Sequence, residues 1–155
     1  MRTIEGTPAA AGLRVAVVVS KYNDFVTDRL LAGALAALAK LGVAGGHITV
    51  IKVPGAFEIP LAAQQAAATA TFDAVVCLGC LIRGATAHFE YIASAVSHGL
   101  IAASAATGVP IAFGVLTTNA VEDAIERAGE GPANKGWEAA VAAVEMATVI
   151  AQIKQ

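Results

Sequence analysis

The sequence predicts an α/β fold in which a four-stranded parallel sheet lies between two layers of helices. Four short apolar runs rich in Val, Ile and Ala alternate with longer segments of helical character. Strands buried on both faces of a parallel sheet are nearly continuous apolar runs, and alternation with helices places helices on both faces. The 155 residues are enough for one domain, 1–155, in which residues 1–12 form an N-terminal arm.

The clearest strand signal is Val15–Val19, an almost unbroken β-branched run. The expected strands cover residues 15–19, 48–53, 74–78 and 111–116, with a short additional strand at 3–5. The expected helices cover 24–41, a segment that begins near 60, 87–107, a segment that ends near 129, and 132–153. Gly42 ends the first helix, Pro60 suits the first turn of the second, and Thr117–Asn119 offer capping groups to the fourth.

The composition indicates a homo-oligomer. Apolar residues make up 57% of the chain and charged residues only 14%, against about 45–50% and about 25% in an average soluble domain. A domain of this size has too little interior for that excess of apolar side chains. We therefore expect apolar surface to be buried between subunits.

The charge pattern argues against nucleic acid and against a membrane as partners. The net charge is −2, and Lys and Arg are scattered. Residues 98–121 carry no Asp, Glu, Lys or Arg, but Gly108–Pro110 interrupts them, which favours a helix followed by a buried strand over a membrane span. Residues 1–6 lack the apolar core of a signal peptide, so a cytoplasmic location is expected.

Cys77 and Cys80 have the CxxC spacing of redox pairs and zinc sites. Both belong to or adjoin an expected strand, where three residues span about 10 Å and reverse the facing side, whereas a disulfide needs Cα atoms within about 7 Å. Two reduced thiols are therefore predicted. The three histidines show no metal-ligand spacing, and no metal is expected.

The segment Gly84–His88 follows the third apolar run and opens a long helical pattern. The first N–H groups of a helix have no intrahelical partner, so such a junction is a natural anion site. Ala85 and Thr86 offer N–H groups and a hydroxyl to an anion, and His88 places a base beside it. A histidine that merely caps the helix is the alternative, and the Gly-Ala-Thr context favours the functional interpretation.

Other chemistry-bearing residues leave two interpretations open. Tyr22, at a strand end, can stack on a flat heterocycle or cover the edge of the core. Glu58, between Phe57 and Ile59, can accept hydrogen bonds from a polyol or act as an ordinary helix-start carboxylate. Arg127 and Lys135 are either phosphate-binding groups or solvated surface cations.

Taken in order, five segments closely resemble the lumazine synthase family. They are Lys21–Phe25 (KYNDF), Val53–Pro60 (VPGAFEIP), Leu81–Phe89 (LIRGATAHF), Ala124–Gly129 (AIERAG) and Asn134–Gly136 (NKG). The match runs from Ile4 to Met146, and five motifs in register are far more specific than one glycine-rich loop.

The resemblance implies a transferase of riboflavin biosynthesis that uses no cofactor. It condenses 5-amino-6-ribitylaminouracil with 3,4-dihydroxy-2-butanone 4-phosphate to 6,7-dimethyl-8-ribityllumazine. The implied fold is a flavodoxin-like three-layer sandwich with a four-stranded parallel sheet. Subunits are expected to form pentamers with active sites between neighbours, and twelve pentamers are expected to form a 60-subunit shell. An enclosed riboflavin synthase is the further partner that the resemblance implies. The Pro132–Ala133 pair departs from the family pattern. Because proline fixes φ, this pair affects the angle between the last two helices and therefore the expectation of a shell.

The resemblance also implies the residue roles. Tyr22 stacks on the uracil ring, and His88 transfers protons. The ribityl chain is held at Ala56, Phe57 and Glu58, and the pyrimidine edge meets Cys80, Leu81 and Ile82. The phosphate is held by Ala85, Thr86 and Arg127. Lys135 approaches the ring, and Phe113 reaches in from the adjacent subunit.

Two rival functions remain. A riboflavin synthase-like enzyme of the same fold has no phosphate substrate, and the loop at Gly84–His88 argues against it. A catalytically inactive flavin-binding shell protein has no need of Tyr22, Glu58, His88, Arg127 and Lys135 together.

Overall fold

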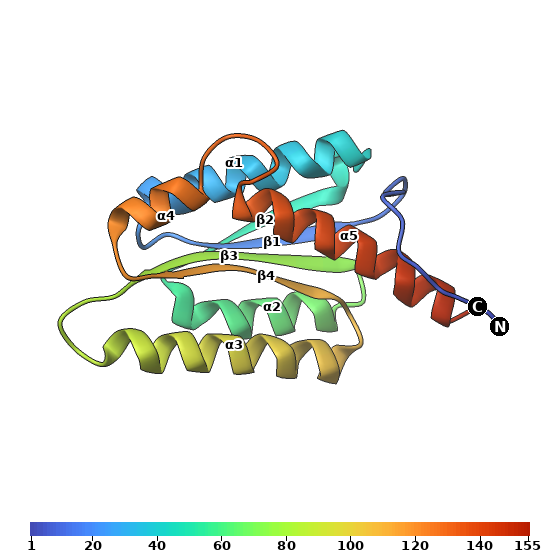
Figure 1. The fold of residues 1–155 in the computed structure, drawn as a ribbon. Helices are drawn as coiled ribbons and strands as arrows, with labels where there is room; N and C mark the ends of the chain where they lie inside the picture. The colour runs from blue at the N-terminus through green and yellow to red at the C-terminus, as the bar shows by residue number, and fades with distance from the viewer.

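In the computed structural model, which describes residues 1–155, a parallel sheet is packed between two layers of helices (Figure 1). This arrangement confirms the predicted fold class. The elements are β1 (Val15–Ser20), α1 (Asp24–Leu41), the 3-10 turn η1 (Gly45–His47), β2 (Ile48–Val53), the 3-10 turn η2 (Ala56–Glu58), α2 (Ile59–Ala68), β3 (Ala74–Ile82), α3 (His88–Thr107), β4 (Ile111–Thr118), α4 (Val121–Arg127) and α5 (Lys135–Ile153).

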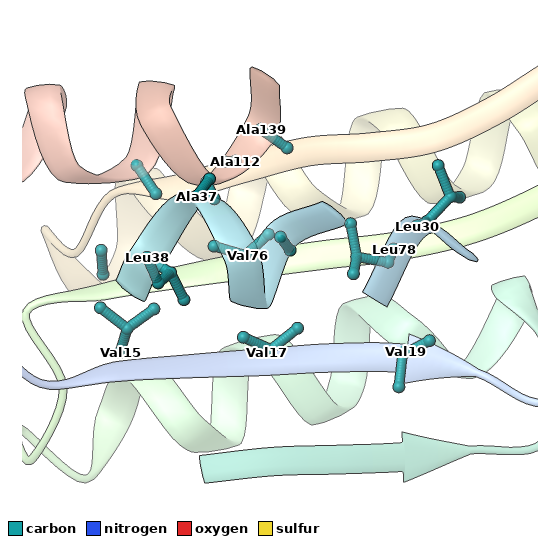
Figure 2. Packing of buried hydrophobic residues seen from close by; sticks show 14 of the residues in the cluster. Val15, Val17, Val19, Leu30, Ala37, Leu38, Val76, Leu78, Ala112 and Ala139 are labelled. Atoms are coloured by element: carbon teal, nitrogen blue, oxygen red, sulfur yellow. The ribbon is translucent and has the colours of Figure 1, made fainter. Parts of the chain in front are cut away.

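The sheet has the strand order β2-β1-β3-β4 with every pair parallel. Helices α1, α4 and α5 cover one face, and α2 and α3 cover the other (Figure 1). Every residue of β1 is buried, as its Val-rich sequence predicts. Its odd-numbered side chains, such as Val17, join the apolar cluster beneath α1 and α5 (Figure 2), and its even-numbered ones, such as Val18, join the cluster beneath α2 and α3.

Small residues let α1 and α5 approach each other closely. A Cβ atom on Gly136 would collide with the carbonyl group of Leu30, and one on Gly33 would collide with the side chain of Asn134. Buried alanines on both helices, Ala34, Ala37, Ala140 and Ala143, continue this contact. The close packing fixes the start of α5, and with it Lys135, against the body of the fold.

Several boundaries differ from the sequence prediction. β3 extends to Ile82 and β4 to Thr118, because the two strands pair with each other along residues that local pattern assigned to loops. α5 begins at Lys135 instead of 132, since Asn134 caps it. The capping role predicted for Thr117–Asn119 is wrong, because α4 has no side-chain cap and the Oδ1 atom of Asn119 accepts from Arg83 Nε.

The short strand expected at 3–5 is not formed within the single chain, since none of the four strands pairs with it. The arm lies along α5 instead. Gln152 Nε2 donates to the carbonyl of Glu5 at 2.7 Å, and the N–H of Thr7 donates to Thr148 Oγ1 at 2.9 Å.

A helix followed by a strand is confirmed for residues 98–121, with α3 ending at Gly108 in the left-handed conformation. By length and composition, α5 is the one helix that could cross a membrane. Its hydropathy has a local explanation, because its buried residues pack on α1 and the sheet.

The α1–α5 contact gives a test of the packing. Gly136→Ala should lower the free energy of unfolding by about 2 kcal/mol, because an added methyl group meets backbone that has no space to yield. Gly46→Ala is the matched control: nothing lies near its added Cβ, so a change within about 0.5 kcal/mol is expected. Denaturant unfolding at one protein concentration compares them, and equal stabilities would refute the packing argument.

Candidate active site

A large cavity lies where β1, β2 and β3 end. In parallel sheets, ligands bind at the carboxyl ends of strands near the point where the strand order reverses. Here that point is β1, because β2 lies on one side of it and β3 on the other. The cavity measures about 760 Å³, a size typical of small-molecule sites. It collects nine of the predicted site residues: Tyr22, Ala56, Phe57, Glu58, Cys80, Leu81, Ile82, Thr86 and His88. We call it the strand-end cavity.

The turn between β1 and α1 presents the ring of Tyr22. The Tyr22 side chain is 73% exposed, and its N–H donates to the carbonyl of Pro54 at 3.0 Å. The next residue, Asn23, has a positive φ of 63°, a conformation in which asparagine is one of the few tolerated residues. Its Nδ2 atom donates to the carbonyl of Cys80 at 2.9 Å. This bond ties the turn after β1 to β3 across the cavity, and leaves the aromatic ring free for stacking.

Glu58 lies at the junction of η2 and α2. It precedes α2 in a helical conformation and makes no capping hydrogen bond with its side chain. Its carboxylate forms no ion pair or hydrogen bond within the chain and lies over Gly55, where even a Cβ would come within 3.3 Å of Oε1. Glu58 thus lies at the start of α2, as the helix-start interpretation has it, and its free acceptor also faces the cavity beside the exposed ring of Phe57, so the two interpretations are compatible.

Cys80, Leu81 and Ile82 are the last residues of β3 and not part of a loop. Cys77 and Cys80 are free thiols on opposite faces of the sheet, as their spacing predicts: Cys77 joins the cluster beneath α2 and α3, and Cys80 the cluster beneath α1 and α5. Burial raises the pKa of Cys80 to about 11 and that of Cys77 still further. Neither thiol is a nucleophile near neutral pH.

The loop between β3 and α3 carries the predicted anion site. Residues 83–88 are exposed, and His88 is the first residue of α3. The N–H of His88 faces Thr86 Oγ1 at 3.4 Å. Thr86 and His88 line the strand-end cavity together, whereas Ala85 borders it without lining it. A phosphate at this helix start would lie beside the imidazole.

Phe113, Arg127 and Lys135 line a separate cavity of about 440 Å³ along the outer edge of β4. The two cavities share no lining residue. The resemblance placed Arg127 with Ala85 and Thr86 and took only Phe113 from a neighbour, but within one chain Arg127 and Lys135 accompany Phe113 instead. We call this second cavity the edge cavity.

Both cations of the edge cavity are anchored by local contacts. Arg127 Nη1 donates to the carbonyl of Asp123 at 3.0 Å, and Lys135 Nζ pairs with Glu138 Oε2 at 2.9 Å. These contacts leave further N–H groups on each side chain free. The ring of Phe113 is 50% exposed beside them.

Asn134 fixes the start of α5 that carries Lys135. Its side chain is 3% exposed and makes four hydrogen bonds: Oδ1 accepts from the N–H groups of Gly136 and Trp137, and Nδ2 donates to the carbonyls of Gly129 and Arg29. The same amide group therefore caps α5 and ties the connection after α4 to α1. Because that connection also follows Arg127, Asn134 sets the separation of both cations.

Sequence reasoning gave no role to several residues that line the strand-end cavity. They include Asn23, Phe89, Tyr91 and Ile92. Asn23 carried a recognisable signal, because an asparagine in a strand-to-helix turn often takes a positive φ. Tyr91 and Ile92 carried none, since apolar residues on a long helix are ordinary core positions.

Comparison with known proteins decides the family. The family model described as 6,7-dimethyl-8-ribityllumazine synthase matches residues 12–151. The chain belongs to the 6,7-dimethyl-8-ribityllumazine synthase family. It is similar to the enzyme of that name from Syntrophus aciditrophicus (strain SB), with 54% identity over 96% of this chain and 97% of the relative. It is also similar to the 6,7-dimethyl-8-ribityllumazine synthase from Desulfatibacillum aliphaticivorans, with 50% identity over 99% of each chain.

Thiol reactivity tests the placement of Cys80 in this lumazine synthase family member. The folded thiol, with a pKa of about 11 instead of the usual 9.0, should be alkylated slowly by iodoacetamide at pH 8 and faster as the pH rises. Between those two pKa values the unfolded thiol ionises first, so this group lowers stability as the pH rises. Peptide mass spectrometry gives the rate, with urea-unfolded protein as the control. Rapid alkylation of the folded protein at pH 8 would contradict the burial.

Proposed function

We propose how this chain performs the reaction of its family. A 6,7-dimethyl-8-ribityllumazine synthase condenses 5-amino-6-ribitylaminouracil with 3,4-dihydroxy-2-butanone 4-phosphate, and this chain is a transferase of that kind. The products are the lumazine, inorganic phosphate and two molecules of water. The riboflavin synthase-like and inactive shell-protein alternatives are not favoured by the family match.

The active site is composite, with the strand-end cavity of one subunit facing the edge cavity of the next. One observation carries this proposal: the proposed phosphate loop and the proposed phosphate cation Arg127 line different cavities of one chain. Exposed aromatic rings border both cavities, namely Tyr22, Phe57 and Tyr91 on one and Phe113 on the other. Packing one cavity against the other would bury these rings and bring base, loop and cations together.

Each substrate has a place in this arrangement. Tyr22 stacks on the uracil ring, Ala56, Phe57 and Glu58 hold the ribityl chain, and Cys80–Ile82 present their backbone to the pyrimidine edge. Ala85 and Thr86 bind the phosphate from one subunit, and Arg127 binds it from the next. Lys135 and Phe113 enclose the ring from that second subunit.

The reaction proceeds through an imine. The substrate amine attacks the ketone and a first water leaves as the imine forms. Phosphate is then eliminated, and the ribityl-bearing amine closes the ring on the remaining carbonyl with loss of a second water. His88 moves protons between nitrogen, carbon and oxygen in these steps. The α3 N-terminus and Arg127 stabilise the departing phosphate. Holding the two reactants together supplies the larger part of the rate enhancement, because proximity can lower the barrier by about 7–11 kcal/mol.

A closed ring of subunits completes every composite site, because each chain presents its strand-end cavity to one neighbour and its edge cavity to the other. A pentamer is the assembly that we propose, with twelve pentamers forming a 60-subunit shell in the cytoplasm. The exposed apolar residues support burial between chains: besides the rings above they include Val50, Leu61, Ile101, Val121 and Ile125. An enclosed riboflavin synthase is a partner of this assembly.

Replacement of the base tests its role. His88→Ala should slow lumazine formation by about 10²–10⁴-fold, because proton transfers then depend on water. Absorbance follows the lumazine, and one phosphate released per lumazine verifies the reaction. His98→Ala is the control: His98 bonds only within its own helix, to Ser94, and full activity is expected. A loss no larger than that of the control would leave His88 without a catalytic role.

Complementation tests the composite site. Arg127→Ala alone should weaken use of the phosphorylated substrate far more than use of the uracil. When His88→Ala and Arg127→Ala chains are co-expressed, roughly a quarter of the sites in a random assembly carry both intact residues, because the two come from different chains. Activity of the mixture above either variant alone is expected. No recovery in verified mixed oligomers would place the two residues in one subunit's site.

A further inference from the structure

Arg83 borders the proposed phosphate loop but has no role in the reaction as described. It follows the last residue of β3, and its N–H donates to the carbonyl of Thr118 at the end of β4 at 2.8 Å. Its side chain lines neither cavity. The residue is therefore at the site without facing a substrate.

The Arg83 side chain contacts two different segments. Its Nε atom donates to Asn119 Oδ1 at 2.8 Å, and its Nη1 atom pairs with Glu90 Oε1 at 2.7 Å. Its guanidinium carbon lies 4.6 Å from the centroid of the Phe89 ring. Asn119 belongs to the connection after β4, whereas Phe89 and Glu90 belong to the first turn of α3.

These contacts bracket the loop. Residues 84–87 are exposed and receive no hydrogen bond from another part of the fold; their bonds are those of Thr86 with His88 and of Ala87 with Glu90 and Tyr91. Arg83 immediately precedes this loop, and its side-chain partners Phe89 and Glu90 immediately follow it. The arginine thus sets the distance and angle between the two ends of the loop.

We propose that Arg83 is a positioning residue that holds residues 84–87 and His88 in the conformation that receives the phosphate. This inference rests on the proposed phosphate role of the loop. The geometry needs the planar fork of arginine, which reaches Asn119 and Glu90 with two different nitrogens while it stacks on Phe89; a lysine has one nitrogen and no plane.

The effect should be local. The side chains of Arg83 and Glu90 are 44% and 62% exposed, and an ion pair this exposed contributes little to the stability of a fold. Loss of the contacts should therefore loosen the loop without a change in thermal unfolding. A direct phosphate ligand is the alternative role, and it predicts the opposite effect of Glu90→Gln, because neutralising Glu90 would free the guanidinium for the anion.

The experiment compares Arg83→Gln, Arg83→Lys and Glu90→Gln in the assembled enzyme, with Arg14→Gln as a control beyond the other end of the sheet. In Arg83→Gln, kcat/KM for the phosphorylated substrate should fall about 10–100-fold, while KM for the uracil stays within about twofold. In Arg83→Lys the fall in this kcat/KM should be smaller than in Arg83→Gln. Glu90→Gln should bind inorganic phosphate more weakly than the parent enzyme. Hydrogen exchange of residues 83–91 should quicken in Arg83→Gln at an unchanged melting temperature.

Two results would overturn the positioning role: exchange and KM in Arg83→Gln equal to those of the parent, or tighter inorganic phosphate binding in Glu90→Gln. Failure of the underlying phosphate proposal has a different signature. In that case saturating inorganic phosphate leaves hydrogen exchange of residues 83–91 unchanged in the parent protein. Faster hydrogen exchange in ligand-free Arg83→Gln would still show that the Arg83 contacts hold the two ends of the loop.

Discussion

Parallel pairing of β1 with β3 is the constraint on which the rest of this structure depends. Parallel strands require crossover connections, and their carboxyl ends meet at one edge of the sheet. The turns after β1, β2 and β3 therefore meet although they are far apart in sequence, and the Asn23–Cys80 hydrogen bond closes the reversal point directly. Because both strands are buried on both faces, this edge is rigid. It holds the exposed loop 84–87 and the exposed rings of Tyr22 and Phe57 in a fixed relation.

The elements were predictable where one local signal dominated. The β-branched run Val15–Val19 strongly favours a buried strand, which the structure confirms. Gly42 and Pro60 mark helix boundaries that the structure also confirms. The ends of β3 and β4 were not predictable, because each strand is extended by pairing with the other. The cap predicted at Asn119 failed for a related reason: its side chain satisfies Arg83 in a distant segment. Local preference yields wherever a tertiary partner competes for the same polar group.

The candidate site also has one part that could be predicted from the sequence and one part that could not. The strand-end cavity was predictable because its residues follow strands that share one edge, a property of topology alone. The place of Arg127 and Lys135 was not, because it depends on how α4 and α5 cross the end of β4. That crossing is set by Asn134 and by the missing side chains of Gly33 and Gly136. A buried asparagine and two glycines look in sequence like a turn, and their role as a spacer between two cations appears only in three dimensions.

The high apolar content of the chain reflects side chains at its surface as well as those in its core. The core uses small side chains: alanines line α1 and α5 where they meet, and no Phe, Tyr or Trp side chain is fully buried. Several aromatic side chains lie instead at the two cavities, where Tyr22, Phe57, Tyr91 and Phe113 are half exposed or more. Exposed rings at this density carry a hydration cost that only association or substrate can remove. The same rings that would seal subunits together would exclude water from the imine and the departing phosphate. In the composite site that we propose, assembly and catalysis rely on one set of side chains, because each subunit completes the site of its neighbour.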